Sequence, residues 1–212
     1  MRVVVIGAGN WGKNLVRNFA SLPGVELAGV ADLSEGVLAR VRQEYPNAKA
    51  TKDASEFFAD ASVDAVVIAT IAPMHFELAR AALAAGKHVY CEKPLTLTAA
   101  DAKALVDLAG QKQRVLMVGH LLEYHPAVLK MKQMVDSGEL GKPYYIYTQR
   151  INLGVVRKDE NAWWSLAPHD VSVVQFLFGA APVSVSASGQ SYLQNGVEDV
   201  VFATLKFADG QM

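Results

Sequence analysis

The sequence predicts an α/β protein in which a doubly wound parallel sheet is followed by an α+β domain with an open, mostly antiparallel sheet. From Met1 to about His120, short β-branched runs alternate with helical patterns, which is typical of β-α-β units. After Gly119, one helical pattern is followed by long alternating runs. The sequence stops just after Asp209-Gly210, a strong hairpin signal, so we expect a truncated second sheet and a fragment of a longer protein rather than a naturally short chain.

The first predicted domain, residues 1–120, alternates strands with helices. Continuously apolar runs predict strands at 2–6, 25–32, 63–70, 88–91 and 115–118. Apolar residues at helical spacing predict helices at 12–22, 74–85 and 98–109, and a further helix that Ser34 caps and that reaches Tyr45. Thr98 and Asp101 resemble a capping box at the start of the last of these helices.

The second predicted domain, residues 121–212, begins with a helix at 126–136, whose Pro suits a first helical turn. Strands are expected at 144–152, 183–192 and 198–207, and the last of them has one apolar face. The helix and the apolar stretch at 171–178 are expected to cover that face. Trp163 and Trp164 are expected to pack in a loop before a helix, with stacking on a uracil or sugar ring as the alternative.

The composition excludes several classes of protein. The 212 residues include 20 Lys and Arg against 21 Asp and Glu, and 51% are apolar, which favours a globular chain over a disordered one. Because Lys and Arg form no run, we expect no nucleic-acid partner. The single cysteine, Cys91, is expected to be a small buried hydrophobe, and it allows neither an internal disulfide nor a thiolate-rich metal site. We therefore expect no metal, no membrane span and a cytoplasmic location.

A glycine-rich turn follows the first strand and opens the first helix. Gly7 permits a tight turn, Gly9 lets the backbone approach a pyrophosphate, and Gly12 lets helix and strand pack closely. The helix N-terminus offers free N–H groups to the same anion. The residues predicted to form this dinucleotide site are Gly7, Ala8, Gly9, Asn10, Trp11 and Gly12. The alternative is a glycine-rich turn that binds no ligand.

Asp32 supports the dinucleotide interpretation. It ends the second strand about twenty residues after the last glycine, where a carboxylate accepts hydrogen bonds from the adenosine ribose. A carboxylate there also repels a 2′-phosphate, so we expect NAD as the cofactor, with NADP less favoured. The nearby Arg40 or Arg42 would reduce that preference.

Two further segments stand at the carboxyl ends of predicted strands, where open parallel sheets bind their ligands. The first supplies the cofactor-side candidates Thr70, Pro73 and His75. If that segment only connects a strand to a helix, His75 is an exposed residue with no role. The second contains Glu92 and Lys93, which would reach the same crevice before Pro94 fixes the backbone. The alternative for Lys93 is an ordinary solvated side chain.

These segments, in this order, resemble the glucose–fructose oxidoreductase, inositol dehydrogenase and rhizopine-catabolism (Gfo/Idh/MocA) family over the whole chain. The shared features are a GxGxxG strand-turn-helix, a Thr-Pro-type segment ending in His, an E-K-P tripeptide, a Gly-His segment before the linking helix, and a late His. In this sequence they are Gly7, Gly9 and Gly12, then Thr70 to His75, Glu92-Lys93-Pro94, Gly119-His120 with Tyr124-His125-Pro126, and His169.

The resemblance implies an NAD(P)-dependent dehydrogenase of polyols or sugars. It would have a Rossmann domain and a second domain that supports the substrate and forms the contacts of a homo-oligomer. His169 would be the base that takes the hydroxyl proton, and Lys93 the cation that favours the developing alkoxide. The other residues expected to meet the substrate are His120, Tyr124, Arg150, Asn152 and Ser165. Solvation at the surface would explain Arg150 equally well.

Ser165 departs from the family pattern. The family commonly has Asp four residues before His169, and a Ser there cannot hold a charge, so the orientation of the substrate stays open. Asp170 compensates for the missing carboxylate in one alternative and caps a helix in the other. The segments 166–170 and 123–127 look most like the branch that oxidises C3 of nucleotide-activated amino sugars.

The leading hypothesis is therefore an NAD-dependent dehydrogenase that oxidises a secondary hydroxyl of a sugar or nucleotide sugar. A free polyol such as inositol, or a simple sugar, is the alternative substrate. Outside enzymes, the alternative is a regulator of the same fold that senses the dinucleotide without turnover. The presence of both Lys93 and His169 argues against the regulator, because a sensor needs no proton acceptor.

Overall fold

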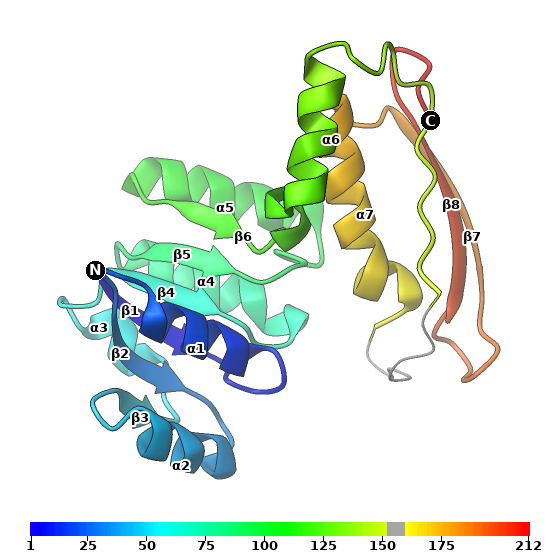
Figure 1. Ribbon diagram of the computed structural model, residues 1–212. Coiled ribbons are helices and arrows are strands. Elements are labelled where there is room, and N and C mark those ends of the chain that lie inside the picture. Colours follow the sequence, from blue (N-terminus) through cyan, green and yellow to red (C-terminus); the bar gives the residue numbers. More distant parts are fainter. Residues whose placement is uncertain (152–159) are drawn as a thin grey trace. The chain divides into compact units, whose positions relative to one another are not determined.

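The computed structural model describes residues 1–151 and 160–212, which divide into two compact units, Met1–Gly119 and His120–Met212 (Figure 1). The first unit contains a six-stranded parallel sheet with the strand order β3-β2-β1-β4-β5-β6. Its strands are β1 (Arg2–Ile6), β2 (Glu26–Ala31), β3 (Lys49–Thr51), β4 (Ala65–Ile68), β5 (His88–Cys91) and β6 (Leu116–Val118). Its helices are α1 (Gly12–Ser21), α2 (Glu35–Glu44), α3 (Ser55–Ala59), α4 (His75–Ala84) and α5 (Ala99–Lys112), with the 3-10 turn η1 (Ala72–Met74) before α4. None of the described helices is both long and apolar enough to cross a membrane.

Helices cover both faces of this sheet, because successive residues of its central strands point to opposite sides. The buried cluster on the side of α1 and α2 includes Val3, Val5, Leu15 and Val41. The buried cluster on the side of α3, α4 and α5 includes Val4, Ile6, Phe57, Leu83 and Leu105. The strands are apolar on both faces, and for that reason they stand out in the sequence as continuous apolar runs. The predicted doubly wound parallel sheet is confirmed.

The winding of the sheet reverses at β1, which lies between β2 and β4. In an open parallel sheet, ligands bind at the carboxyl ends of the strands beside such a reversal. The segments that follow β1, β2, β4 and β5 stand at this edge, and they carry the candidate cofactor residues. Strand β3 and helix α3 could not be predicted from the sequence, because elements of three and five residues are too short to show a period.

The described residues of the second unit form two helices and a two-stranded antiparallel sheet. Its elements are the 3-10 turn η2 (Leu121–Tyr124), α6 (Pro126–Asp136), α7 (Ala162–Phe178), β7 (Ser184–Gln190) and β8 (Val200–Lys206). Helix α6 has the predicted bounds, and α7 packs against η2, α6 and β8. Phe178 at the end of α7 meets Phe207 edge to face, with ring centroids 4.9 Å apart. Helix α7 therefore covers the end of the apolar face of β8.

Helix α7 is longer than the sequence predicts. Trp163 and Trp164 lie in its first turn, so the loop expected there is wrong. Asn161 caps this turn, because its Oδ1 accepts the Trp164 N–H at 3.1 Å. Pro168 lies inside the helix and removes one backbone hydrogen bond, a loss that the packing of this apolar helix against η2, α6 and β8 outweighs. Asp170 therefore lies in the helix interior and is not a cap.

The strand predicted at 144–152 is wrong over its described residues, which lie outside any strand. In the described part of the chain, two backbone hydrogen bonds join this segment to another. The Ile146 N–H donates to the Met212 carbonyl at 2.9 Å, and the Met212 N–H donates to the Tyr144 carbonyl at 3.2 Å. A ladder needs a partner strand along its whole length, and these two bonds supply one at a single point. Asn152 lies outside the described residues.

The hairpin signal at Asp209-Gly210 is confirmed as a turn. Gly210 has a φ of +79°, which favours glycine. Its N–H donates to the Phe207 carbonyl at 3.1 Å, and the Phe207 N–H donates to the Gln211 carbonyl at 3.0 Å. The turn therefore reverses the chain directly after β8.

Cys91, at the end of β5, leads to a prediction about reactivity. Burial raises the pKa of its thiol to about 12, and the adjacent Glu92 carboxylate contributes to the same direction. The raised pKa favours a protonated thiol at neutral pH, and the burial of the side chain confirms the expected small buried hydrophobe. We expect 5,5′-dithiobis(2-nitrobenzoate) at pH 8 to modify Cys91 of the native chain at least about 100-fold more slowly than Cys91 of the chain unfolded in guanidinium. In the unfolded chain the thiol pKa returns to about 8.5. Equal rates in the two states would contradict the burial.

Candidate active site

Two close approaches of the backbone shape the glycine turn between β1 and α1. Gly7 has a φ of +86°, and a Cβ there would lie 2.8 Å from the Ala69 carbonyl oxygen. A Cβ at Gly12 would lie 1.9 Å from the Gly7 carbonyl oxygen. A Cβ at Gly9 would meet nothing within 4 Å. The fold requires the first and last of these glycines, whereas the middle one faces open space.

The turn fits the phosphates of a dinucleotide. Helix α1 begins without a side-chain cap and with no acidic residue in its first turn. Uncapped N–H groups and the positive end of the helix dipole favour an anion at this position. Gly9, Asn10 and Trp11 are exposed directly before the helix, so an anion can approach the backbone there. NAD would be held with its pyrophosphate at this turn.

Asp32, the residue after β2, is fixed against the glycine turn. Its Oδ2 accepts the Ala8 N–H at 2.8 Å, and its Oδ1 accepts the Ser34 N–H at 2.9 Å. Arg40 donates to the carbonyl of the same Ala8 at 2.8 Å. Each carboxylate oxygen has a second lone pair, so Asp32 can still accept from the hydroxyls of a ribose. This position is the one that the sequence analysis assigns to ribose recognition.

The residues after β4 differ in exposure, since Pro73 is exposed, Thr70 is half-buried and His75 is buried. Thr70 follows the strand, and Pro73 lies in η1. His75 is only 1% exposed, so its expected exposure as a connecting residue is wrong. Its Nδ1 lies 2.8 Å from the Pro94 carbonyl oxygen, and its Nε2 lies 3.1 Å from the Thr70 carbonyl oxygen. His75 therefore joins the end of β4 to the segment that follows β5.

Glu92 holds together three parts of the site. It is 6% exposed, and its Oε1 accepts the Trp11 indole N–H at 2.7 Å and the Tyr90 hydroxyl at 3.2 Å. Its Oε2 accepts the Lys93 N–H at 3.3 Å. A Cβ at Gly119 would lie 2.6 Å from the Tyr90 hydroxyl oxygen, so only glycine leaves room for this cluster. One buried carboxylate thus connects the glycine turn with the backbone of Lys93.

The carboxyl edge of the sheet brings together most of the predicted cofactor residues. Those at this edge are Gly7, Ala8, Gly9, Asn10, Trp11, Gly12, Asp32, Thr70, Glu92 and Lys93. The bond from the Trp11 indole to Glu92 could not be predicted, because residues 81 positions apart share no sequence signal. Within residues 1–151 and 160–212, no three His, Cys, Asp or Glu side chains are grouped to hold a metal ion.

Helix α7 of the second unit carries the predicted base. Ser165 and His169 are four positions apart on this helix, so they lie on one face of it. The Ser165 hydroxyl carries no charge. The Ser165 backbone N–H donates to the Asn161 carbonyl at 3.0 Å. The His169 carbonyl accepts the Ser172 hydroxyl at 3.0 Å. The helix backbone therefore positions the two residues as neighbours.

Arg150 forms an ion pair with Asp170, with the Arg150 Nε 2.7 Å from the Asp170 Oδ2. This ion pair accounts for the carboxylate at position 170 better than either alternative from the sequence, a replacement for the missing family Asp or a helix cap. Arg150, Asp170 and Ser165 line an open hollow of about 1620 Å³ within the second unit. Tyr124 is 64% exposed in η2, and the Nδ1 of His120 is buried without a hydrogen-bond partner in the described part of the chain. Of these groups, Arg150, Asp170 and Ser165 line the hollow, whereas the His120 Nδ1 is buried.

The strand order and the glycine turn define a dinucleotide-binding Rossmann domain. Comparison with known families assigns it further: residues 1–120 match the family described as "Oxidoreductase family, NAD-binding Rossmann fold", and residues 128–212 match the family described as "GFO/IDH/MocA C-terminal domain". The chain belongs to the Gfo/Idh/MocA oxidoreductase family. The predicted resemblance and NAD as the cofactor are confirmed.

Several relatives have names that state a dehydrogenase activity. The chain is 28% identical to the myo-inositol 2-dehydrogenase of Thermotoga maritima, over 100% of the chain and 66% of the relative. It is 31% identical to the scyllo-inositol 2-dehydrogenase (NAD(+)) of Bacillus subtilis, over 90% and 57%, and 34% identical to the UDP-N-acetylglucosamine 3-dehydrogenase of Acidithiobacillus ferrooxidans, over 89% and 58%. Among solved structures, a probable dehydrogenase from Thermotoga maritima aligns with a TM-score of 0.88 at 27% identity, over 100% of the chain and 66% of that structure. The chain thus spans 57–66% of the length of these named relatives.

The glycine turn leads to a paired prediction. We expect Gly12→Ala to lower the free energy of unfolding of the first unit by about 2–3 kcal/mol, because the new Cβ meets the Gly7 carbonyl oxygen. Gly9→Ala should change it by less than about 0.5 kcal/mol, because the Cβ enters open space. The same Gly9 variant should bind NAD at least about tenfold more weakly, since the methyl group occupies the path of the pyrophosphate. Urea unfolding and calorimetric NAD titration measure the two effects, and equal destabilisation by both variants would contradict the geometry.

Proposed function

We propose that this chain carries the cofactor site and the catalytic residues of an NAD-dependent dehydrogenase that oxidises a secondary hydroxyl of a sugar or nucleotide sugar. One example of such a reaction is the oxidation of C3 of a UDP-N-acetylamino sugar. The observation that supports it most is the position of Lys93. Its backbone N–H and the Trp11 indole of the glycine turn are bonded to the same Glu92 carboxylate. A cation and a cofactor-binding turn are therefore anchored to one group at the edge where a Rossmann sheet binds its ligands.

The chemistry divides between two side chains. Bound NAD supplies the acceptor for the hydride that leaves the substrate carbon. The ammonium group of Lys93 would stabilise the alkoxide that develops on the substrate oxygen. The imidazole of His169 would take the hydroxyl proton as a general base. The α7 backbone and the neighbouring Ser165 would orient that imidazole and one substrate hydroxyl.

The names of the relatives support two classes of substrate. One relative is named as a dehydrogenase of a UDP-amino sugar at C3, and others are named as inositol dehydrogenases. Trp163 in the first turn of α7 lines the same hollow as Arg150 and Ser165, so the hollow is lined by both an aromatic ring and a guanidinium, the latter paired with Asp170. That combination suits a nucleotide with its base and phosphates, whereas free inositol needs only hydroxyl partners. Inositol is the second candidate substrate.

We also propose that the protein forms a homo-oligomer and lies in the cytoplasm. The exposed faces of β7 and β8 would form the contacts of a homo-oligomer, because large apolar side chains such as Phe202 and Val185 are exposed on them. No feature of the chain requires an oxidising compartment, so we place the protein in the cytoplasm.

Substitution of the two catalytic candidates tests the mechanism. We expect Lys93→Ala and His169→Ala each to lower kcat by at least about 10² while NAD affinity stays nearly intact, because each removes a group that acts on the substrate hydroxyl. Lys103→Ala, which removes an exposed lysine of α5, is the matched control and should retain wild-type kcat. Turnover at the wild-type rate in both active-site variants would refute the assignment.

The substrate class can be tested on the natural full-length protein by following absorbance at 340 nm with NAD. The panel should contain UDP-N-acetylglucosamine, its uronic acid, myo-inositol, scyllo-inositol and free glucose. We expect reduction of NAD with a nucleotide sugar. Reduction with an inositol alone would select the second candidate, and NAD binding with no reduction by any compound would favour the dinucleotide-sensing regulator.

A further inference from the structure

We propose that Glu35 helps to decide which dinucleotide this chain accepts, by neutralising two cations beside Asp32 that would otherwise attract the 2′-phosphate of NADP. The inference rests on the dinucleotide binding that the proposed function requires. It concerns residues outside the motifs that define the family site, namely Glu35, Arg42 and Lys52.

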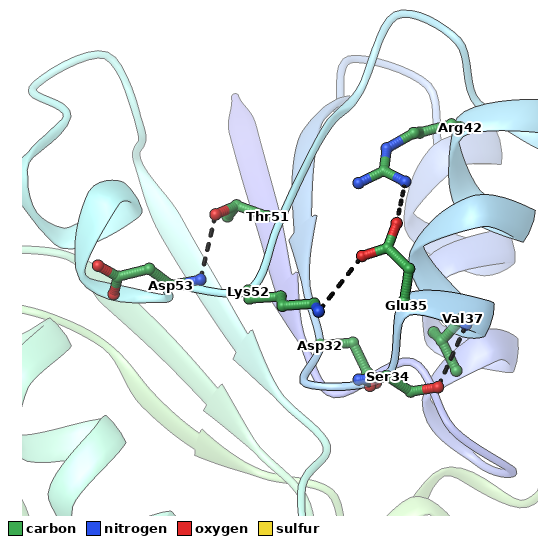
Figure 2. Close-up of polar contacts among 8 residues, drawn as sticks. All are labelled: Asp32, Ser34, Glu35, Val37, Arg42, Thr51, Lys52 and Asp53. Carbon is green, nitrogen blue, oxygen red and sulfur yellow. Dashed lines mark hydrogen bonds and ion pairs between the residues drawn. The ribbon is translucent and has the colours of Figure 1, made fainter.

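The three side chains form one ion cluster (Figure 2). The Arg42 Nη1 lies 2.6 Å from the Glu35 Oε1, and the Lys52 Nζ lies 3.5 Å from the Glu35 Oε2. Each cation therefore uses a different oxygen of one carboxylate. Figure 2 shows the two cations approaching Glu35 from different elements, Arg42 from α2 and Lys52 from the segment after β3.

The cluster stands directly beside the ribose position. Glu35 is the first residue of α2 and follows Asp32 by three positions. Strand β3 pairs with β2, and the Asp32 N–H donates to the Thr51 carbonyl at 3.1 Å, so Lys52 follows a residue that is bonded to the Asp32 backbone. A phosphate on the 2′-hydroxyl of a ribose held by Asp32 would meet this cluster.

Other polar groups near Asp32 are already committed. Arg40 donates to the Ala8 carbonyl at 2.8 Å, and so it fixes the glycine turn. The Ser34 hydroxyl accepts the Val37 N–H at 3.4 Å as the cap of α2. Among the described residues of these segments, Arg42 and Lys52 are therefore the cations that could be redirected to a phosphate.

Electrostatics gives the direction of the effect. The hydrogen bond from Arg42 lowers the pKa of Glu35, so this carboxylate is ionised throughout the neutral range. Asp32 and Glu35 carry two negative charges, which balance the two positive charges of Arg42 and Lys52. Arg40, bonded to the Ala8 carbonyl, adds a positive charge nearby that stays the same in every variant used below. All three cluster side chains are at least half exposed, so each ion pair contributes little to stability and the charges remain accessible to a ligand. Removal of the Glu35 charge leaves a net positive charge that acts on NADP but not on the uncharged 2′-hydroxyl of NAD.

The test is the ratio of dissociation constants for NADPH and NADH, measured by fluorescence titration at low salt without substrate. We expect Glu35→Gln to lower this ratio about fivefold, and the effect should shrink at 0.5 M salt because the charges are screened. The double variant Glu35→Gln with Lys52→Gln restores local neutrality and should return the ratio toward the wild-type value. Glu77→Gln, which removes an exposed carboxylate paired with Arg80 on α4, is the matched control and should leave the ratio unchanged.

The outcomes separate this inference from the proposed function. An unchanged ratio in a Glu35→Gln variant that binds NADH overturns the inference alone. Loss of NADH binding by that variant also overturns it, because Glu35 would then support the α2 start rather than select the cofactor. If the wild-type chain binds neither dinucleotide, the proposed function fails together with the inference.

Discussion

The approach of Gly12 to the Gly7 carbonyl oxygen is the contact on which the rest of the site depends. It allows α1 to start immediately above the end of β1, and it leaves the intervening residues exposed at the helix N-terminus. From this position the Ala8 N–H reaches Asp32 and the Trp11 indole reaches Glu92. A side chain at either glycine would separate the helix from the strand, and the bonds to both carboxylates would then be lost together.

Two carboxylates hold the turn from opposite sides, and they do so in different environments. Glu92 is buried, and a buried carboxylate is tolerated only with several donors, which Trp11, Tyr90 and the Lys93 backbone provide. Asp32 satisfies its oxygens with backbone N–H groups and keeps lone pairs for a ligand. The first carboxylate is therefore part of the framework, whereas the second is available for recognition. Packing of Tyr90 against Phe19 of α1, with ring centroids 6.1 Å apart, adds an apolar support to the same framework.

Local patterns in the sequence predict the elements whose signals are local. The continuous apolar strands, the Ser34 and Thr98 caps, the Pro126 helix start and the Asp209-Gly210 turn follow from neighbouring residues, and the structure confirms them. Features that depend on residues distant in the sequence could not be predicted from these local patterns. The segment 144–151 alternates like a strand, but among the described residues it has a backbone partner at one point only. Pro168 disfavours a helix in the sequence, yet tertiary packing maintains α7 through it. The candidate residues could be placed at the strand ends from the sequence, but the burial of His75 and the Arg150–Asp170 pair come from contacts that no motif encodes.

The Trp11 indole has a consequence for how the protein can be observed. It is 48% exposed, and its N–H is fixed to Glu92 inside the turn that would receive the dinucleotide. Tryptophan emission overlaps the absorption of a reduced nicotinamide, so energy transfer from Trp11 would report occupation of the site. Trp11 is therefore an optical probe at the cofactor turn that responds to the reduced dinucleotide without any added label.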